Sequence, residues 1–316
     1  MKLKCLNIDN VHHNFNLLQK LLVLNFGFIV LASIFGFCSS QSPEAISYAA
    51  ISVVGDSLPY DLQNPSLTIN LVNEELREIS GLSPSDVPGY FLAIADERGE
   101  VYLIDGEHGG AVTHRLLFRE KGDFEGVEMA GKTVWAVKSD GDLFEIVDWK
   151  KKNPKITEYS TALKKSNDVE GLAFDPWRNC LLLACKENPD SLYNRDIWAF
   201  QMNTKTLDKT PLYSINPEEI NNILPYAENE KRVFFSPSGI AVHPKTKDLY
   251  LVSTTLKRLV VLDYISGKIK YVYRLDKKLL PQPEGISFDA AGNLFLASEG
   301  KKGQGLLLKF SNKQSN

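Results

Sequence analysis

A glycine motif that recurs five times constrains this 316-residue chain more than any other feature. The glycines are Gly81, Gly126, Gly171, Gly239 and Gly285. The intervals between them are 45, 45, 68 and 46 residues. Repeats in the forties that consist of short strands are typical of a β-propeller, in which each repeat forms one four-stranded blade. We therefore expect an all-β chain with one glycine motif in each blade.

Each repeat carries the same strand pattern. The strand that contains the glycine is followed by a strongly apolar second strand, as fits a strand covered on both faces by neighbouring blades. These second strands are expected at 90–95, 133–137, 180–185, 249–253 and 294–297. The fifth repeat ends one strand short, while residues 66–72 alternate as a strand before the first repeat. We expect this N-terminal strand to complete the last blade and close the ring.

The long interval between Gly171 and Gly239 indicates an insertion. It exceeds the usual interval by 23 residues, about half a blade, and falls at roughly 216–234, with a short helix expected at 217–224. The sequence therefore predicts a propeller domain at 65–312 with five four-stranded blades, and a six-bladed ring is the alternative.

The first forty residues (1–40) read as an export signal or membrane anchor. Residues 17–37 are almost all apolar, and lysines precede or open the segment. The uninterrupted part, 21–37, is longer than most signal-peptide cores and shorter than a spanning helix. Cys38 follows directly and predicts a lipoprotein signal with lipidation at Cys38, although a lipobox has a small residue where this chain has Phe37.

Two alternatives remain open for this segment, namely cleavage near Ser40 and an uncleaved anchor. All three place the rest of the chain outside the cytoplasm. We therefore predict an extracytoplasmic protein that is membrane-anchored in the periplasm or at the cell surface, with free secretion as the alternative. The mixed, proline-containing residues 41–64 are expected to form a linker.

Charge and cysteine content argue against two further classes of function. The net charge is −3, so no basic surface indicates nucleic-acid binding. Cys180 and Cys185 lie in one expected strand, too far apart along it for a disulfide and on opposite faces. We expect two free, buried thiols and not a redox or metal motif.

The residue before each repeat glycine should return to the mouth of the central channel. These residues are Ser80, Glu125, Glu170, Ser238 and Glu284. Three carboxylates that converge on one axis repel each other and require protons, Lys or Arg, or a bound cation. Because Ca2+ accepts carboxylate and other oxygen ligands, the sequence predicts a Ca2+ site at Glu125, Glu170 and Glu284. A purely structural ion-pair network is the alternative.

A second polar layer follows the apolar second strands and should face the same mouth. Its members are Asp96, Glu97, Lys138, Ser139, Lys186, Glu187, Ser253, Thr254, Ser298 and Glu299. The ligand-binding residues that we predict are Ser80, Asp96, Glu97, Lys186, Glu187, Ser238 and Glu299. Lys138 and Lys186 could equally balance the glutamates. No catalytic motif occurs, and no histidine has metal-ligand spacing, so no catalytic residue is predicted.

Several of these motifs, in this order, resemble the SdiA-regulated (YjiK-like) family. They include Asp96-Glu97-Arg98, the run 167–176 (NDVEGLAFDP) and the run 281–286 (PQPEGI), and the likeness covers about 66–310. The resemblance implies a β-propeller outside the cytoplasm behind a signal or anchor, and no established activity. Where the family tends to show Ser-Asp-Glu-Ser in the fourth blade, this chain has Ser253-Thr254-Thr255. More distantly, the Glu-Gly repeats resemble gluconolactonase and esterase-like phytase propellers, which hold divalent cations with channel carboxylates.

Three functions remain open at this stage. The first is a binding module for a small polar ligand or an envelope protein, with Ca2+ stabilising the channel mouth. The second is a metal-dependent hydrolase of lactones, esters or phosphate esters, in which the metal acts as Lewis acid and activates water. The third is a scaffold without metal. The sequence favours the binding module, because no histidine is placed to act as a general base.

The lipidation prediction is tested by Cys38→Ser followed by membrane fractionation. We expect the variant to move from the membrane pellet to the soluble fraction, because the acyl chains on Cys38 would be its anchor. Unchanged pelleting would contradict lipidation and favour an uncleaved helix.

Overall fold

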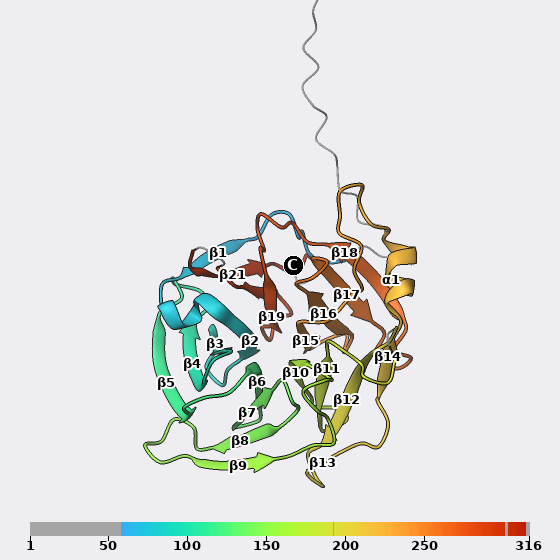
Figure 1. Ribbon diagram of the computed structural model, residues 1–316. Coiled ribbons are helices and arrows are strands. Elements are labelled where there is room, and N and C mark those ends of the chain that lie inside the picture. The colour runs from blue at the N-terminus through green and yellow to red at the C-terminus, as the bar shows by residue number, and fades with distance from the viewer. Residues whose placement is uncertain (1–57, 192, 301–302, 314–316) are drawn as a thin grey trace, which may run out of the picture. The chain divides into compact units, whose positions relative to one another are not determined.

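Five antiparallel sheets surround a common axis in the part of the chain that the computed structural model describes, residues 58–191, 193–300 and 303–313 (Figure 1). The five-bladed, all-β prediction is confirmed. The export segment, Cys38 and the first part of the predicted linker lie outside the described residues. Within these residues no helix is sufficiently long and apolar to cross a membrane.

Each blade begins with an inner strand at the axis and continues outward. Blade one contains β2 (Ile79–Pro84), β3 (Tyr90–Ala95), β4 (Gly99–Asp105) and β5 (Val112–Arg119). Blade two contains β6 (Phe124–Ala130), β7 (Thr133–Lys138), β8 (Leu143–Val147) and β9 (Lys155–Tyr159). Blade three contains β10 (Val169–Asp175), β11 (Cys180–Cys185), β12 (Arg195–Gln201), β13 (Thr206–Leu207) and β14 (Tyr213–Ile215). Blade four contains β15 (Gly239–Val242), β16 (Leu249–Ser253), β17 (Arg258–Leu262) and β18 (Ile269–Arg274).

Blade five is completed by the N-terminal strand, as the sequence predicts. It contains β19 (Pro283–Phe288), β20 (Leu294–Ser298), β21 (Gly305–Phe310) and the outermost strand β1 (Leu67–Leu71). Strand β1 pairs antiparallel with β21, with Leu67 opposite Lys309 and Leu71 opposite Gly305. A short 3-10 helix, η1 (Glu74–Glu78), then leads from β1 into blade one.

The last residues of the predicted linker pack into the propeller. Leu58 and Tyr60 are buried between blades four and five. The Tyr60 hydroxyl donates to the Gly292 carbonyl at 2.7 Å, and the Leu58 N–H donates to the Tyr273 hydroxyl at 3.0 Å. The propeller fold therefore begins several residues before the first strand.

The outer edge of blade three is divided, unlike the single outer strand of the other four blades. Two short strands, β13 and β14, pair with opposite ends of β12. Between them lies Pro211, which has no N–H for a ladder hydrogen bond. The edge strand is interrupted there for this reason.

The insertion forms the helix α1 (Pro217–Ile223), close to the expected range, and a loop that is attached to blade four. Ile220 and Phe235 are fully buried against this blade. Glu230 accepts two hydrogen bonds from the buried guanidinium of Arg258, at 2.6 and 2.7 Å, and lies 3.3 Å from Arg274. The insertion is therefore a fixed part of the blade, and the five sheets leave no sixth blade in the described chain.

The repeat glycines let neighbouring inner strands approach each other at the axis. A Cβ atom on Gly126 would lie 2.7 Å from the Leu172 Cβ, and one on Gly171 would lie 2.9 Å from a methyl group of Ile240. A Cβ atom on Gly239 would collide with the main-chain carbonyl of Glu284. Each glycine thus packs against the inner strand of the next blade, and a larger residue has no room there.

We predict that Gly239→Ala destabilises the propeller by about 1–3 kcal/mol, because main chain cannot move aside as a flexible side chain can. Chemical denaturation measures the change. Gly131→Asn is the control, because no atom lies within 4 Å of a Cβ there and asparagine tolerates the left-handed backbone at φ +67°. Equal stability of Gly239→Ala and the parent would contradict the packing argument.

Candidate functional site

In four of the five blades the residue before the repeat glycine occupies an irregular position in its strand, whereas Ser238 directly precedes β15, whose pairing is regular. The pairing of inner and second strands shifts register between Ile79 and Gly81, and again between Phe124 and Gly126. The same shift occurs in β10 and β19. A bulged residue has no cross-strand partner, and its side chain is re-aimed out of the regular alternation. The bulges therefore turn Ser80, Glu125 and their equivalents toward the channel.

Four of these five residues, all except Ser238, meet at the axis. A cavity of about 10 Å3 at the channel mouth is lined by the repeat glycines and by Ser80, Glu125, Glu170 and Glu284. Space of this size holds about one water molecule. We call Ser80, Glu125, Glu170, Ser238 and Glu284 the mouth ring.

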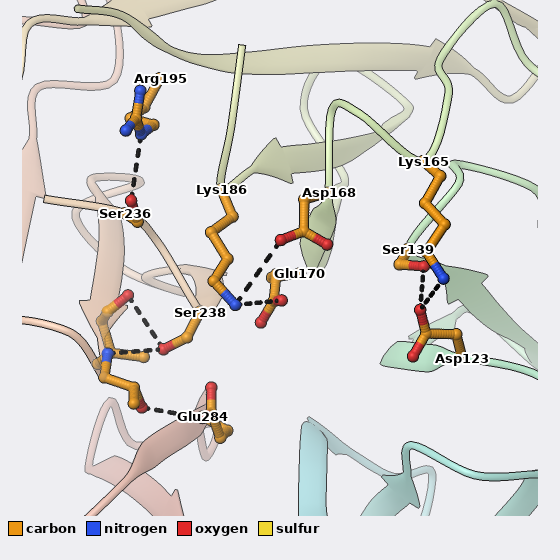
Figure 2. Close-up of polar contacts among 12 residues, drawn as sticks. Asp123, Ser139, Lys165, Asp168, Glu170, Lys186, Arg195, Ser236, Ser238 and Glu284 are labelled. Carbon is orange, nitrogen blue, oxygen red and sulfur yellow. Dashed lines mark hydrogen bonds and ion pairs between the residues drawn. The ribbon is translucent and has the colours of Figure 1, made fainter. Parts of the chain in front are cut away.

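Glu170 is the member of the mouth ring that has a cationic partner. The Lys186 Nζ donates to the Glu170 Oε1 at 2.7 Å and lies 3.8 Å from Asp168 (Figure 2). Burial raises the pKa of Glu170 to about 6, and the attraction of Lys186 opposes this rise. The predicted ligand-binding residue Lys186 therefore neutralises one carboxylate of the ring.

Glu284 has a neutral partner instead. The Thr254 hydroxyl lies 2.9 Å from the Glu284 Oε1 and 2.7 Å from the Pro283 carbonyl. The Ser238 hydroxyl donates to the same carbonyl at 2.7 Å. Burial, and next the charge of Glu170, raise the pKa of Glu284 to about 8. Thr254 thus supplies a hydrogen bond to Glu284 without adding a charge to the ring.

Glu125 has no hydrogen-bond donor among the described residues. Burial raises its pKa to about 9, and the nearby charges of Glu170, Asp123 and Glu284 raise it further. A carboxyl group with this pKa holds its proton at neutral pH. The mouth ring therefore contains more acidic groups than cations. Glu125 is the acidic group of the ring that has neither a cation nor a hydrogen-bond donor as partner in the described chain.

The second polar layer divides into residues that face the ring and residues that do not. Lys138 binds Asp140 at 2.6 Å and turns away from the glutamates. Glu187 lies 3.4 Å from Arg195, and Glu299 accepts a hydrogen bond from Gln282. The structure thus brings Lys186 and Thr254 to the ring, while Glu187 and Glu299 form their own pairs beside it.

Asp96 and Glu97 line a separate acidic cleft of about 550 Å3 beside η1. The Oδ1 of Asp96 is buried and has no hydrogen-bond partner within the described chain. Burial, and then the charge of Glu78, raise the pKa of Asp96. The charge of Asp96 also contributes to raising the pKa of Glu125, so the acid of the cleft acts on the mouth ring.

A third set of polar residues also lies near the ring and is not among the predicted site residues. It comprises the residues three before each glycine, namely Glu78, Asp123, Asp168, Ser236 and Gln282. Asp123 accepts from Ser139 at 2.5 Å and lies 3.5 Å from Lys165, and Ser236 binds Arg195 at 3.2 Å (Figure 2). The signal was present, because the glycine repeat places a polar residue at this offset in every blade.

No three His, Cys, Asp or Glu side chains in the described ranges are grouped to hold a metal ion. The Ca2+ site at Glu125, Glu170 and Glu284 therefore stays a prediction. His243 is buried beside Tyr60 at the opposite end of its inner strand, and burial lowers its pKa to about 4.

The prediction of free, buried cysteines is confirmed. Cys180 and Cys185 are buried in β11 and are not bonded to each other, and burial raises the pKa of each thiol to about 12. Both thiols therefore stay protonated and unreactive at neutral pH.

Comparison with known proteins gives one family match. A family model described as SdiA-regulated matches residues 60–302, most of the chain. No curated protein matches this sequence.

Solved structures share the fold at low identity. Glutaminyl cyclase of Myxococcus xanthus is 12% identical with a TM-score of 0.53, over 78% of this chain and 95% of that chain. Aldose sugar dehydrogenase of Streptomyces coelicolor, in its PQQ-bound form, is 12% identical with a TM-score of 0.46, over 78% and 97%. A chain of a nidogen/laminin complex is 18% identical with a TM-score of 0.47, over 72% and 74%. The likeness to glutaminyl cyclase supports the propeller fold alone.

The raised pKa of Glu125 predicts how stability depends on pH. The folded state keeps a proton that the unfolded state loses above about pH 4.5, so the stability from this group declines as pH rises through about 9. Glu125→Gln should flatten this decline and raise the free energy of unfolding at pH 9 by about 1–3 kcal/mol. Urea denaturation from pH 5 to 9 measures it.

Glu158→Gln on the outer strand β9 is the matched control, because Glu158 is exposed and lies 3.2 Å from Arg119. It should leave the pH profile unchanged. If Glu125→Gln and the parent showed parallel profiles, the assignment of a proton to Glu125 would be wrong.

Proposed function

The chain belongs to the SdiA-regulated family, and on this premise we propose that it is a binding module whose channel mouth receives a positively charged group. The observation that carries the proposal is Glu125, a buried carboxyl group with no donor in the described chain and with other acidic groups around it. A cation at this position would compensate the charge of several carboxylates at once.

The size of the mouth limits the group that can enter. The cavity of about 10 Å3 at the mouth ring admits a single ion or the tip of one side chain or ligand. Lys186 lies on one side of the ring and pairs with Glu170 and Asp168. The carboxyl groups without an ion-pair partner are therefore those of Glu125 and Glu284, and a bound cation would lie beside them. Both Ca2+ and the ammonium group of a larger ligand meet this demand.

The acidic surface continues beyond the ring and favours a ligand with more than one contact. Asp96 acts on Glu125 through its charge and lies in the cleft beside η1. The cleft is also lined by Glu74, Glu75 and Glu78 and by two arginines, Arg77 and Arg98. A small cationic ligand, or a basic segment of an envelope protein, would bind ring and cleft together. The proposal includes an extracytoplasmic location behind the N-terminal segment, which rests on the sequence of residues 1–40.

The alternative function, a metal-dependent hydrolase, also requires a cation to bind at the mouth ring. Its metal would have to bind the carboxylates of the mouth before it could act as a Lewis acid. Divalent cation binding is therefore the first requirement of that alternative as well, and one titration addresses both functions.

We predict saturable binding of Ca2+ or of spermidine, used as a polyamine probe, to the chelator-treated protein. Calorimetric titration and melting curves measure it, and the ligand that binds should raise the melting temperature. Glu125→Gln should weaken binding about tenfold, because the amide carries no charge, and Glu158→Gln should leave it unchanged.

The identity of the ligand that binds decides between the two cations. Ca2+ binding would support the predicted metal site and justify tests of lactone and ester hydrolysis. Spermidine binding alone would support recognition of an ammonium group. Binding of neither, or equal binding by Glu125→Gln, would overturn the proposal and leave the mouth ring a structural network.

A further inference from the structure

A larger, mainly apolar cavity of about 610 Å3, which we call the cup, lies at the opposite end of the inner strands. Residues of all five blades line it, from the ends of the inner strands and the loops that follow them. Its apolar lining includes Phe91, Met129, Phe174, Trp177 and Phe288. A cavity of this size and lining is typical of small-molecule sites.

The floor of the cup is built by a further repeat of the glycine motif. The residues two after each glycine are Ser83, Glu128, Ala173, Ala241 and Ser287. All are buried, and all except Ser83 line the cup directly. Because residues two apart share a strand face, these positions lie on the same side of each inner strand as the glycine. The floor thus carries one acid and two hydroxyls among small side chains, and of the two hydroxyl residues only Ser287 lines the cup directly.

Glu128 is the charged group of this floor, and it is 9% exposed. The Ser83 hydroxyl donates to its Oε1 at 3.0 Å, and the Met129 N–H donates to the same oxygen at 3.2 Å. Burial raises the pKa of Glu128 to about 8. No lysine or arginine in the described chain forms an ion pair with it, in contrast to Glu170 at the mouth.

The rim of the cup offers Glu128 no cation. No lysine, arginine or histidine lines the cup in the described part of the chain. Its rim carboxylates already have partners outside the lining: Asp86 lies 2.7 Å from Lys150, and Glu107 and Asp289 each lie 3.8 Å from Lys309. The uncompensated acid of the cup is therefore Glu128.

Ser287 is a second, independent observation that points to a ligand in the cup. Its hydroxyl is 1% exposed, lines the cup and has no hydrogen-bond partner among the described residues. A buried hydroxyl without a partner costs free energy that a bound polar atom would offset.

We propose that the cup binds a hydrophobic amine, with the ammonium group at Glu128 and Ser287 and the apolar body against the aromatic rim. The charge of the ammonium complements the uncompensated acid, and the apolar walls take up the rest of the molecule. In binding, Glu128 releases its proton to solvent and the carboxylate pairs with the ammonium. This site is distinct from the mouth ring at the other end of the channel.

The test uses two fluorescent probes that differ in one group. Dansylcadaverine carries a primary amine on a pentyl chain, and N-pentyl dansylamide is the same molecule without the amine. In fluorescence titrations of the purified full-length protein, we expect the amine to bind about tenfold more tightly than the neutral probe. Glu128→Gln should remove this preference, because the amide keeps the size of the side chain and loses its charge.

Two further variants define the site. Glu125→Gln, three residues earlier on the same strand, changes the mouth ring and should leave the preference for the amine intact. Ala290→Trp narrows the cup from an exposed position and should weaken both probes about tenfold. Equal binding of the two probes to the parent protein would overturn the proposal. So would a preference that is lost in Glu125→Gln and kept in Glu128→Gln, because the amine would then bind at the mouth.

Discussion

The close approach of the inner strands at the axis governs the whole molecule. Five strands can surround a channel this narrow only where a residue without a side chain faces the next strand, and a Cβ on Gly126 or Gly171 would already lie within 3 Å of the neighbouring blade. The glycine is therefore fixed in each blade, and the residues around it are fixed relative to the axis. The residues next to the glycine in each blade therefore lie close to their equivalents in the other blades, and polar side chains at these positions converge.

A buried acid in this channel behaves differently with and without a cation beside it. At the mouth, Lys186 lies 2.7 Å from Glu170, and the pKa of Glu170 rises only to about 6. At the other end Glu128 has a hydroxyl and a main-chain N–H as donors and no cation, and its pKa rises to about 8. Burial without a counter-charge is costly, so such a group keeps its proton until a cation arrives.

Much of the fold could be predicted from the sequence because it follows from a period. The interval near 45 residues indicates the blades, and the missing strand of the last repeat indicates that β1 pairs with β21. The mouth ring was predicted for the same reason, since its members directly precede the glycines. These features depend on spacing along the chain and not on which side chains meet.

The partners of the charged residues could not be predicted, because they depend on register. Lys138 and Lys186 both close a second strand, and the sequence treats them alike. In the structure Lys138 pairs with Phe124 across the sheet, whereas Cys185, and not Lys186, pairs with the corresponding Val169. A difference of one residue reverses the direction of a side chain, so Lys186 reaches the ring and Lys138 binds Asp140.

The pairing of β1 with β21 also sets the order in which the ring can form. The first and the last strands of the propeller lie in one blade, with Leu67 opposite Lys309, so blade five stays incomplete until almost the whole chain has been synthesised. Contacts between such distant residues form slowly, because a very long loop must close before they give any stability. A chain built in this way remains open during its synthesis and closes only after its last strand has emerged.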